Sequence, residues 1–282
     1  MEKVDTDASF GIQWRPFETL GDLDYADDIC LITHRLQDMK QKFEKLAAIS
    51  SLVGLKVNFK KTKLMRIGTT NIQPLSVVID SKQHTIDDVK HFCYLGSIVA
   101  TDGGTELDIK TRITKARVDF DKLKKVWCSR NISRKLKLRL FNSCVKSVLL
   151  YSSETWKVTE QITSKLQAFT NSCLRRICRI FWPNVISNIN LWQLTSSRPI
   201  DKEILERKWR WIGHTLRKPV NDVARMAFEY DPRGSRQRGR PRMTWRRSIE
   251  AESKKFGSWN QIKKLAQNRT QWKKFVAALC SD

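Results

Sequence analysis

Long apolar runs are missing from this 282-residue chain. Its longest runs have only a few residues, whereas a membrane-spanning helix needs about 20 consecutive apolar residues. The first ten residues, MEKVDTDASF, are acidic and lack the apolar segment of a secretory signal. These absences exclude a membrane span, argue against secretion and lead us to expect an intracellular protein.

The cysteines show no spacing that is typical of a zinc site. The seven cysteines are scattered, odd in number and contain no C-x₂-C pair. The closest two, Cys173 and Cys178, have no nearby His that would complete a zinc site. Reduced thiols are the simpler interpretation.

Acidic residues are scarce, but only in one part of the chain. The sequence has 53 Lys and Arg against 29 Asp and Glu, a formal net charge of +24. Residues 1–100 contain 13 basic and 13 acidic residues, so residues 101–282, with 40 and 16, hold the whole excess. Such a segregated charge predicts a polyanionic partner, nucleic acid first and an anionic membrane surface second. The ten Trp favour nucleic acid because aromatic faces stack on bases, although a single Trp is more often a core residue.

The first hundred residues predict a small α+β unit. Apolar residues recur at helical spacing over 36–49, and Gly54 follows where a C-cap glycine belongs. Alternating or short apolar stretches predict strands at 23–26, 29–32, 57–59, 75–80 and 91–99.

Beyond Gly103-Gly104 the sequence predicts helices. Thr105 can cap the first of them, and apolar residues recur on one face from Ile109 onward. Pro183 marks a boundary, and a breaker-rich stretch with five Arg interrupts the last third. We therefore expect three regions, at residues 1–104, 105–182 and 183–282, with the Arg-rich loop at 231–242.

Two adjacent carboxylates, Asp27 and Asp28, lie between apolar stretches in DLDYADDICLI. A tight turn is the ordinary explanation, because Asp is common there. Clustered carboxylates at a hairpin bend also suit Mg²⁺, and a two-metal site stabilises the attacking and leaving oxygens of a phosphoryl transfer. The two interpretations are compatible, since a metal-binding hairpin is still a hairpin.

The segment LDYADDICLI resembles the Y/F-A-D-D box of reverse transcriptases, particularly those of non-LTR (LINE-type) retrotransposons. Further segments resemble other conserved segments of that family and occur in the same order, from about residue 11 to the end. The nearest likeness is to RTE-type elements. These segments are GLKVNFKKTKLMRIG, FCYLGSIV, KSVLLYSSETW, RWIGHTLRKP, RGRPRMTWRRSIEAE and NRTQWKKFVAALC.

The resemblance implies the C-terminal half of a reverse-transcriptase palm at residues 1–104, a helical thumb and a basic helical C-terminal region. In the family, the pair matched by Asp27 and Asp28 works with a third, upstream Asp to hold two Mg²⁺ ions. The residue matched by Tyr25 packs near the primer terminus.

Further site residues follow from the same resemblance. Lys61 would lie near the triphosphate, with a solvated surface lysine as the alternative. Tyr94, Leu95 and Gly96 would form the primer grip, with an ordinary buried strand turn as the alternative.

The chain departs from the family upstream of the box. Only 24 residues precede Tyr25, and none of their four Asp lies on an apolar strand pattern far enough upstream to be the first catalytic Asp. The fingers and the endonuclease domain are also missing. We expect a truncated RNA-directed DNA polymerase that binds Mg²⁺ weakly or not at all. It would be inactive by itself and would need an upstream retrotransposon polypeptide for chemistry.

The stretch RGSRQRGRPRMTWRR is the second candidate site. Its R-G-R-P core resembles an AT-hook, which enters the minor groove of A·T-rich DNA, with a solvated basic loop as the alternative. Trp245 could stack on a base or lie in a helix core. The phosphate-binding candidates are Arg233, Arg236, Arg238, Arg240, Arg242, Arg246 and Arg247.

Three functions remain open from the sequence. The chain could be a polymerase fragment that needs a partner for chemistry, or a module that binds RNA and DNA backbones through residues 101–282. It could also be a retroelement relic without selected activity, whose half-palm exposes a sheet edge.

Overall fold

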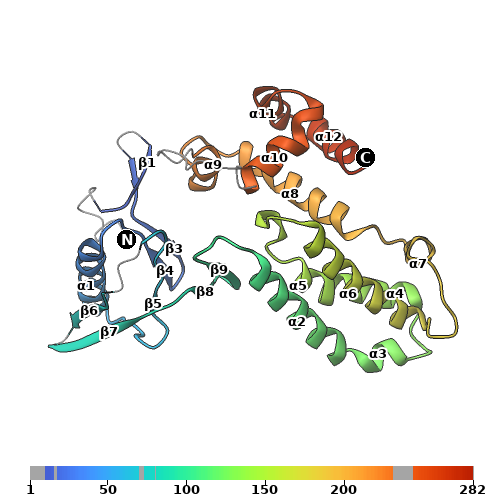
Figure 1. Cartoon of the computed structure of the whole chain (residues 1–282), viewed down its shortest axis with the longest axis horizontal. Coiled ribbons are helices and arrows are strands. Elements are labelled where there is room, and N and C mark those ends of the chain that lie inside the picture. Colours follow the sequence, from blue (N-terminus) through green and yellow to red (C-terminus); the bar gives the residue numbers. More distant parts are fainter. Residues whose placement is uncertain (1–9, 16–17, 70–72, 80, 231–243, 282) are drawn as a thin grey trace. The chain divides into compact units, whose positions relative to one another are not determined.

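The computed structural model describes residues 10–15, 18–69, 73–79, 81–230 and 244–281 (Figure 1). The chain divides into two compact units. The first comprises residues 1–104 and 226–233, and the second comprises residues 105–225 and 234–282. We call them the α+β unit and the helical unit. The Arg-rich loop 231–242 lies outside the described residues.

The α+β unit is built from short antiparallel hairpins and one small sheet. Strands β1–β2, β3–β4 and β8–β9 each pair as a two-stranded hairpin. A three-stranded sheet has the order β5-β7-β6, with β5 parallel to β7. The elements are β1 (Ile12–Arg15), β2 (Glu18–Leu20), β3 (Asp22–Tyr25), β4 (Asp28–Leu31), α1 (Leu36–Leu52), β5 (Lys63–Leu64), β6 (Leu75–Ile79), β7 (Lys82–Asp88), β8 (His91–Tyr94) and β9 (Ser97–Ala100).

Helix α1 packs on β6 and closes a small core. Phe43 of α1 is buried against Leu75 and Val77 of β6. Two polar contacts fix the helix in place. Lys42 donates its Nζ to the carbonyl of Gly21 at 3.0 Å, and the β6 backbone donates to a carboxylate oxygen of Glu44 at 3.1 Å. The helix predicted from the apolar spacing is confirmed.

Two strand predictions in this unit are wrong. Residues 57–59 form a loop and turn instead of a strand, because the Asn58 carbonyl accepts from the backbone N–H groups of Lys61 and Thr62 at 3.1 and 2.9 Å. Phe59 still faces the core side and stacks on His84, with ring centroids 3.8 Å apart. Residues 91–99, predicted as one strand, fold back as the β8–β9 hairpin.

The helical unit begins after Gly104. Its helices are α2 (Glu106–Lys122), α3 (Lys124–Cys128), α4 (Arg134–Leu140), a π-helical segment (Phe141–Lys146), α5 (Ser147–Leu149), α6 (Glu160–Cys178), α7 (Asn188–Thr195), α8 (Ile200–Leu216), α9 (Val223–Glu229), α10 (Trp245–Ser253), α11 (Trp259–Gln267) and α12 (Arg269–Ser281), with short 3₁₀ turns at Ser153–Thr155 and Lys254–Phe256. Helix α9 ends in residues assigned to the α+β unit. Within the described ranges, no helix combines the length and apolar character that crossing a membrane requires.

One hydrophobic core joins α2 to α8. Ile109 and Phe120 of α2 belong to the same buried cluster as Leu191, Ile200 and Ile204. This core therefore continues across the boundary that Pro183 marks in the sequence. Thr105 precedes α2 as expected, but its hydroxyl donates to the Lys157 carbonyl at 3.4 Å instead of capping the helix.

Two buried donors of this unit have hydrogen-bond partners. The Trp156 indole N–H donates to Asp108 Oδ2 at 3.0 Å, and the Arg112 guanidinium lies 3.7 Å from the other carboxylate oxygen. Lys137 donates its buried Nζ to the carbonyls of Trp127 and Ser129 at 2.9 and 2.6 Å. The ammonium thereby ties the end of α3 to α4.

A second cluster, rich in aromatic residues, closes the end of the unit. Trp209 of α8 lies against Trp272 and Phe275 of α12, with ring centroids 6.0 and 5.4 Å apart. Glu252 of α10 accepts from the Trp209 indole at 2.7 Å and from Lys208. Gly213 is required here, since a Cβ at this position would lie 2.0 Å from Trp272 Nε1.

Trp245, left open by the sequence, is part of the packing. Its indole N–H donates to the Glu154 carbonyl at 3.0 Å, and its ring meets Trp211 edge to face at 5.9 Å. The ring therefore packs within the helical unit, although the residue is only half-buried. All seven cysteines are free, and burial raises the pKa of the Cys173 thiol to about 12.

Candidate nucleic-acid interface

The β3–β4 hairpin holds the acidic pair at its tip. Tyr25 pairs with Asp28, which leaves Ala26 and Asp27 as a two-residue turn. Ala26 has a φ of +56°, in the left-handed region. Asp27 therefore lies in the turn and Asp28 begins β4, and both are exposed. Two short strands joined near the acidic pair are confirmed.

The β8–β9 hairpin has a comparable turn. Tyr94 pairs with Ser97, and the two residues between them, Leu95 and Gly96, have φ values of +48° and +82°. Positive φ at both positions is the signature of a type I′ turn, which matches the twist of the flanking strands. Leu95 and Gly96 are thus a tight, exposed turn.

A hydrogen bond joins the two hairpins. Tyr94 donates its hydroxyl to the Leu23 carbonyl of β3 at 3.4 Å, across 71 residues of sequence. Burial raises the pKa of the Tyr94 phenol, and nearby Cys30, Asp28 and Asp24 raise it further. The structure therefore brings the two motifs together, although the sequence separates them, and surrounds their contact with negative charge.

The described residues do not complete a metal site. Among them, no three His, Cys, Asp or Glu side chains are grouped so that they could hold an ion. Asp27 and Asp28 offer two exposed carboxylates. Mg²⁺ is commonly bound by one or two carboxylates only when substrate phosphates and water supply the remaining oxygens. The donor set does not fit an ion held by this part of the chain alone.

Two other predicted site residues lie at the surface. Lys61 is exposed in the turn after Asn58. The backbone N–H of Lys61 donates to the Asn58 side chain at 3.2 Å. In the described part of the chain, no hydrogen bond joins Lys61 to either hairpin. Tyr25 is 67% exposed, so its ring is open to a ligand.

A second basic segment of the helical unit lies outside the motifs predicted from the sequence. Residues 122–153 contain nine basic and no acidic residues. Three of the nine are engaged. Lys137 is buried, Lys146 pairs with Glu203 at 2.7 Å, and Lys122 pairs with Asp119 at 2.8 Å. The other six are exposed and form no ion pair with any described residue. We call them the α3–α4 basic patch: Lys124, Lys125, Arg130, Arg134, Lys135 and Arg139.

The signal for this patch was present in the sequence as a run without acidic residues. The Arg-rich stretch that the motif predicted is denser in charge, and only its end is described. Arg246 and Arg247 lie in the first turn of α10, and Arg246 lies 3.5 Å from a Glu250 carboxylate oxygen. The remaining candidates are outside the described residues: Arg233, Arg236, Arg238, Arg240 and Arg242.

The six unpaired cations can act as a phosphate-binding surface. Lys and Arg side chains that bind phosphates release the counterions of a nucleic acid, which favours association without reading sequence. By contrast, the α+β unit offers an acidic hairpin tip. The two units therefore differ in the kind of ligand that their exposed charges can attract.

Comparison with known proteins gives two matches. The model of one protein family, a domain of unknown function (DUF6451), matches residues 119–151, which include the α3–α4 basic patch. The chain is also 26% identical over 267 residues to an uncharacterized transposon-derived protein of Caenorhabditis elegans, covering 90% of this chain and 94% of that protein. No solved structure matches the chain. The similarity suggests a transposon origin and leaves the type of element open.

Proposed function

We propose that the chain descends from a non-LTR retrotransposon reverse transcriptase and binds nucleic acid through its helical unit, without polymerising DNA by itself. The α3–α4 basic patch is the observation on which the binding rests. It presents six exposed cations in a run with no acidic residue, within the part of the chain that contains the whole excess of +24. The similarity to a transposon-derived protein supports the ancestry.

Binding of this kind depends strongly on salt and only slightly on sequence. A protein that contacts six to ten phosphates loses roughly 10³- to 10⁵-fold in affinity between 50 and 200 mM salt. Phosphate contacts position a nucleic acid without specifying its bases. RNA and DNA are therefore both expected ligands, held mainly by their backbones.

Catalysis by the chain alone is not expected. Polymerase chemistry depends on two metal ions held close to the primer end and the triphosphate, and positioning supplies much of the rate. Two exposed carboxylates at a hairpin tip give neither the ligand number nor the enclosure.

A completed polymerase site is the second candidate. The Tyr94 hydroxyl bonded to the Leu23 carbonyl favours it, because this contact brings together the two hairpins that the family uses at the primer end. Another polypeptide, such as the upstream part of a retrotransposon protein, would have to supply the further carboxylate.

The binding proposal is tested with two matched triple variants of the full chain. K124E/K125E/K135E reverses three charges of the basic patch. K56E/K60E/K82E reverses three exposed lysines of the α+β unit and changes the net charge equally. Affinity for labelled RNA and duplex DNA is measured by fluorescence anisotropy from 50 to 200 mM KCl.

The patch variant is expected to bind at least tenfold more weakly and to reduce the salt slope by about three, since each phosphate contact contributes about 0.9. The control variant keeps the slope. Equal losses in both variants would mean that net charge, and not this patch, attracts the nucleic acid.

Catalysis is tested by Mg²⁺-dependent primer extension on an RNA template. The chain and its D27N/D28N variant are both expected to leave the primer unextended. Extension by the chain that disappears in the variant would contradict the proposal and would mean that the chain completes its own site.

A further inference from the structure

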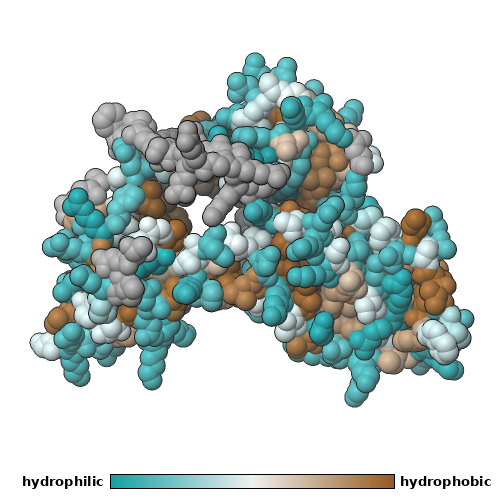
Figure 2. Space-filling model, viewed as in Figure 1, coloured by the Kyte–Doolittle hydropathy of each residue, from teal (hydrophilic) through white to brown (hydrophobic). Residues whose placement is uncertain are grey.

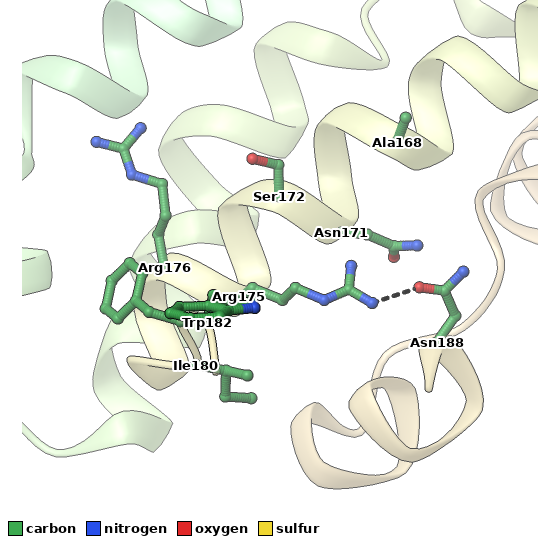
Figure 3. A pocket seen from close by; sticks show the side chains of 9 residues that line it. Ala168, Asn171, Ser172, Arg175, Arg176, Ile180, Trp182 and Asn188 are labelled. Carbon is green, nitrogen blue, oxygen red and sulfur yellow. Dashed lines mark hydrogen bonds between the residues drawn. The ribbon is translucent and has the colours of Figure 1, made fainter. Parts of the chain in front are cut away.

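A shallow groove lies along the second half of α6, where the chain leaves this helix and turns toward α7 (Figure 3). Its volume is about 570 Å³. Small side chains of α6 line one side, and the segment after α6 lines the other. The polar and aromatic residues that line it are Asn171, Ser172, Arg175, Arg176, Phe181, Trp182 and Asn188.

Trp182 stands at this groove with its ring in solvent. It is 88% exposed and its neighbour Phe181 is 58% exposed, whereas Trp156 and Trp209 of the same unit are 2% and 0% exposed. Large aromatic side chains bury much apolar area when they can, so an open indole next to a groove indicates a ligand that covers it. Figure 2 shows hydrophobic side chains gathered at the surface around α7, where Ile189 is exposed as well.

The surroundings of Trp182 select a negatively charged ligand. Residues 161–200 contain no Asp or Glu and five basic residues. Arg175 donates its Nη2 to two neutral oxygens, the Asn188 Oδ1 at 2.7 Å and the Ile186 carbonyl at 3.3 Å. The guanidinium is thereby held in place while its charge is not neutralised.

Arg176, on the other side, lies over the Phe120 ring, 5.0 Å from its centroid, and pairs with one exposed carboxylate. Its Nη1 lies 3.5 Å from Asp121 Oδ1, and the two side chains are 46% and 54% exposed. Exposed pairs of this kind contribute little and exchange readily for another anion. Two guanidinium groups therefore border the groove beside an open indole.

The groove is already formed without a ligand. Asn171, which is buried in its wall, accepts through Oδ1 from Gln167 of the same helix at 2.8 Å and from the Trp192 indole of α7 at 2.9 Å. This bridge joins α6 to α7 and fixes the wall. A preformed site loses less conformational entropy on binding.

We propose that this groove is a stacking site for single-stranded nucleic acid, in which Trp182 stacks on one base while Arg175 and Arg176 bind the flanking phosphates. The inference rests on the proposed function and adds a strand preference to it. A base can stack on a protein ring only when its face is open, as in a single strand, whereas the bases of a duplex are covered by their neighbours. The basic patch alone would bind both forms through their phosphates.

The test compares three variants of the full chain. W182A removes the ring, W182F keeps a smaller ring, and V185A shortens another side chain of the same loop that is 78% exposed but has no ring. Affinities for a fluorescein-labelled 12-nucleotide RNA, the DNA of the same sequence and the DNA duplex are measured by anisotropy at 100 mM KCl.

W182A is expected to weaken single-strand binding by roughly 5- to 150-fold, the fold-change that corresponds to one stacked base. Duplex binding stays unchanged, W182F keeps an intermediate affinity and V185A behaves like the parent chain. A larger loss on RNA or on DNA identifies which single strand the site prefers.

Other outcomes separate the two proposals. If the parent chain binds nucleic acid and W182A binds single strands equally well, the stacking site is refuted while the proposed function stands. Equal losses in W182A and V185A would identify a general apolar contact, as for a protein partner, and also refute stacking. If the parent chain binds no nucleic acid, the proposed function fails first. Circular dichroism of W182A checks the fold, and W182F gives the comparison if that variant is misfolded.

Discussion

The α+β unit and the helical unit differ in how they bury apolar surface. Among the described residues, the main core cluster of the first contains five buried residues, whereas that of the second contains seventeen, besides the aromatic cluster around Trp209. Burial of apolar area is the dominant favourable term in folding. The acidic hairpin therefore belongs to the less extensively packed unit, and the basic patch to the better packed one.

The two units also differ in where their charged groups lie. In the helical unit, two buried donors are satisfied locally: Lys137 by two carbonyls and Trp156 by Asp108. The six cations of the α3–α4 basic patch, by contrast, lie at the surface. The residues 1–100 are neutral overall. The net positive charge of the chain therefore belongs to residues 101–282.

The largest expected effect is on the aromatic cluster of the helical unit. W209A removes a side chain that is 0% exposed, together with its hydrogen bond to Glu252. Truncating a buried Trp to Ala typically costs about 3–5 kcal/mol, so the helical unit should unfold at a much lower denaturant concentration. Chemical denaturation followed by circular dichroism measures this. W182A, at an 88% exposed position, should change the free energy of unfolding by less than about 0.5 kcal/mol.

Two matched Val→Ala substitutions, one in each unit, test whether the units unfold separately. V77A in β6 and V145A in the π-helical segment each shorten a valine that is 0% exposed. Each should cost about 2 kcal/mol for the lost methyl groups and the cavity. V77A should lower only the transition of the α+β unit, and V145A only that of the helical unit. Residue-resolved hydrogen exchange distinguishes them. A single transition that moves in both variants would mean that the units fold cooperatively.

The sequence was most informative where one periodicity extended over many residues. The apolar spacing of 36–49 predicted α1, and the recurrence from Ile109 onward predicted α2, because each helix buries a single face. The strand at 57–59 was misread because Val57 and Phe59 alternate with polar residues. The Asn58 carbonyl, which accepts from two backbone N–H groups, makes a turn there instead. Such a turn is a local preference that alternation does not reveal.

The candidate sites were predictable to different degrees. The Asp27-Asp28 turn followed from the residues themselves. The bond from Tyr94 to Leu23 could not be predicted from spacing, because it depends on how two separate hairpins meet. The α3–α4 basic patch could have been found from its lack of acidic residues. Its division into buried, paired and free cations required the structure, since Lys137 and Lys146 look the same in sequence as their exposed neighbours.

The smallest expected effect concerns the turn that presents Asp27. Ala26 has a φ of +56°, a conformation that costs an L-residue with a Cβ roughly 1–2 kcal/mol and glycine much less. A26G should therefore stabilise the α+β unit, by at most about 1 kcal/mol because glycine also gains entropy in the unfolded chain. The transition of the helical unit should not move.

The control for this variant is A47G, in the middle of α1, where the backbone is helical and the side chain is 4% exposed. Glycine costs about 1 kcal/mol in a helix interior, so A47G should destabilise the same unit that A26G stabilises. Loss of stability in both variants would contradict the left-handed Ala26 and, with it, the pairing of Tyr25 with Asp28. If A26G raises the free energy of unfolding of this unit and A47G lowers it, Ala26 is strained where it holds the acidic pair at the hairpin tip. The small core of this unit must then offset the free energy of that strain.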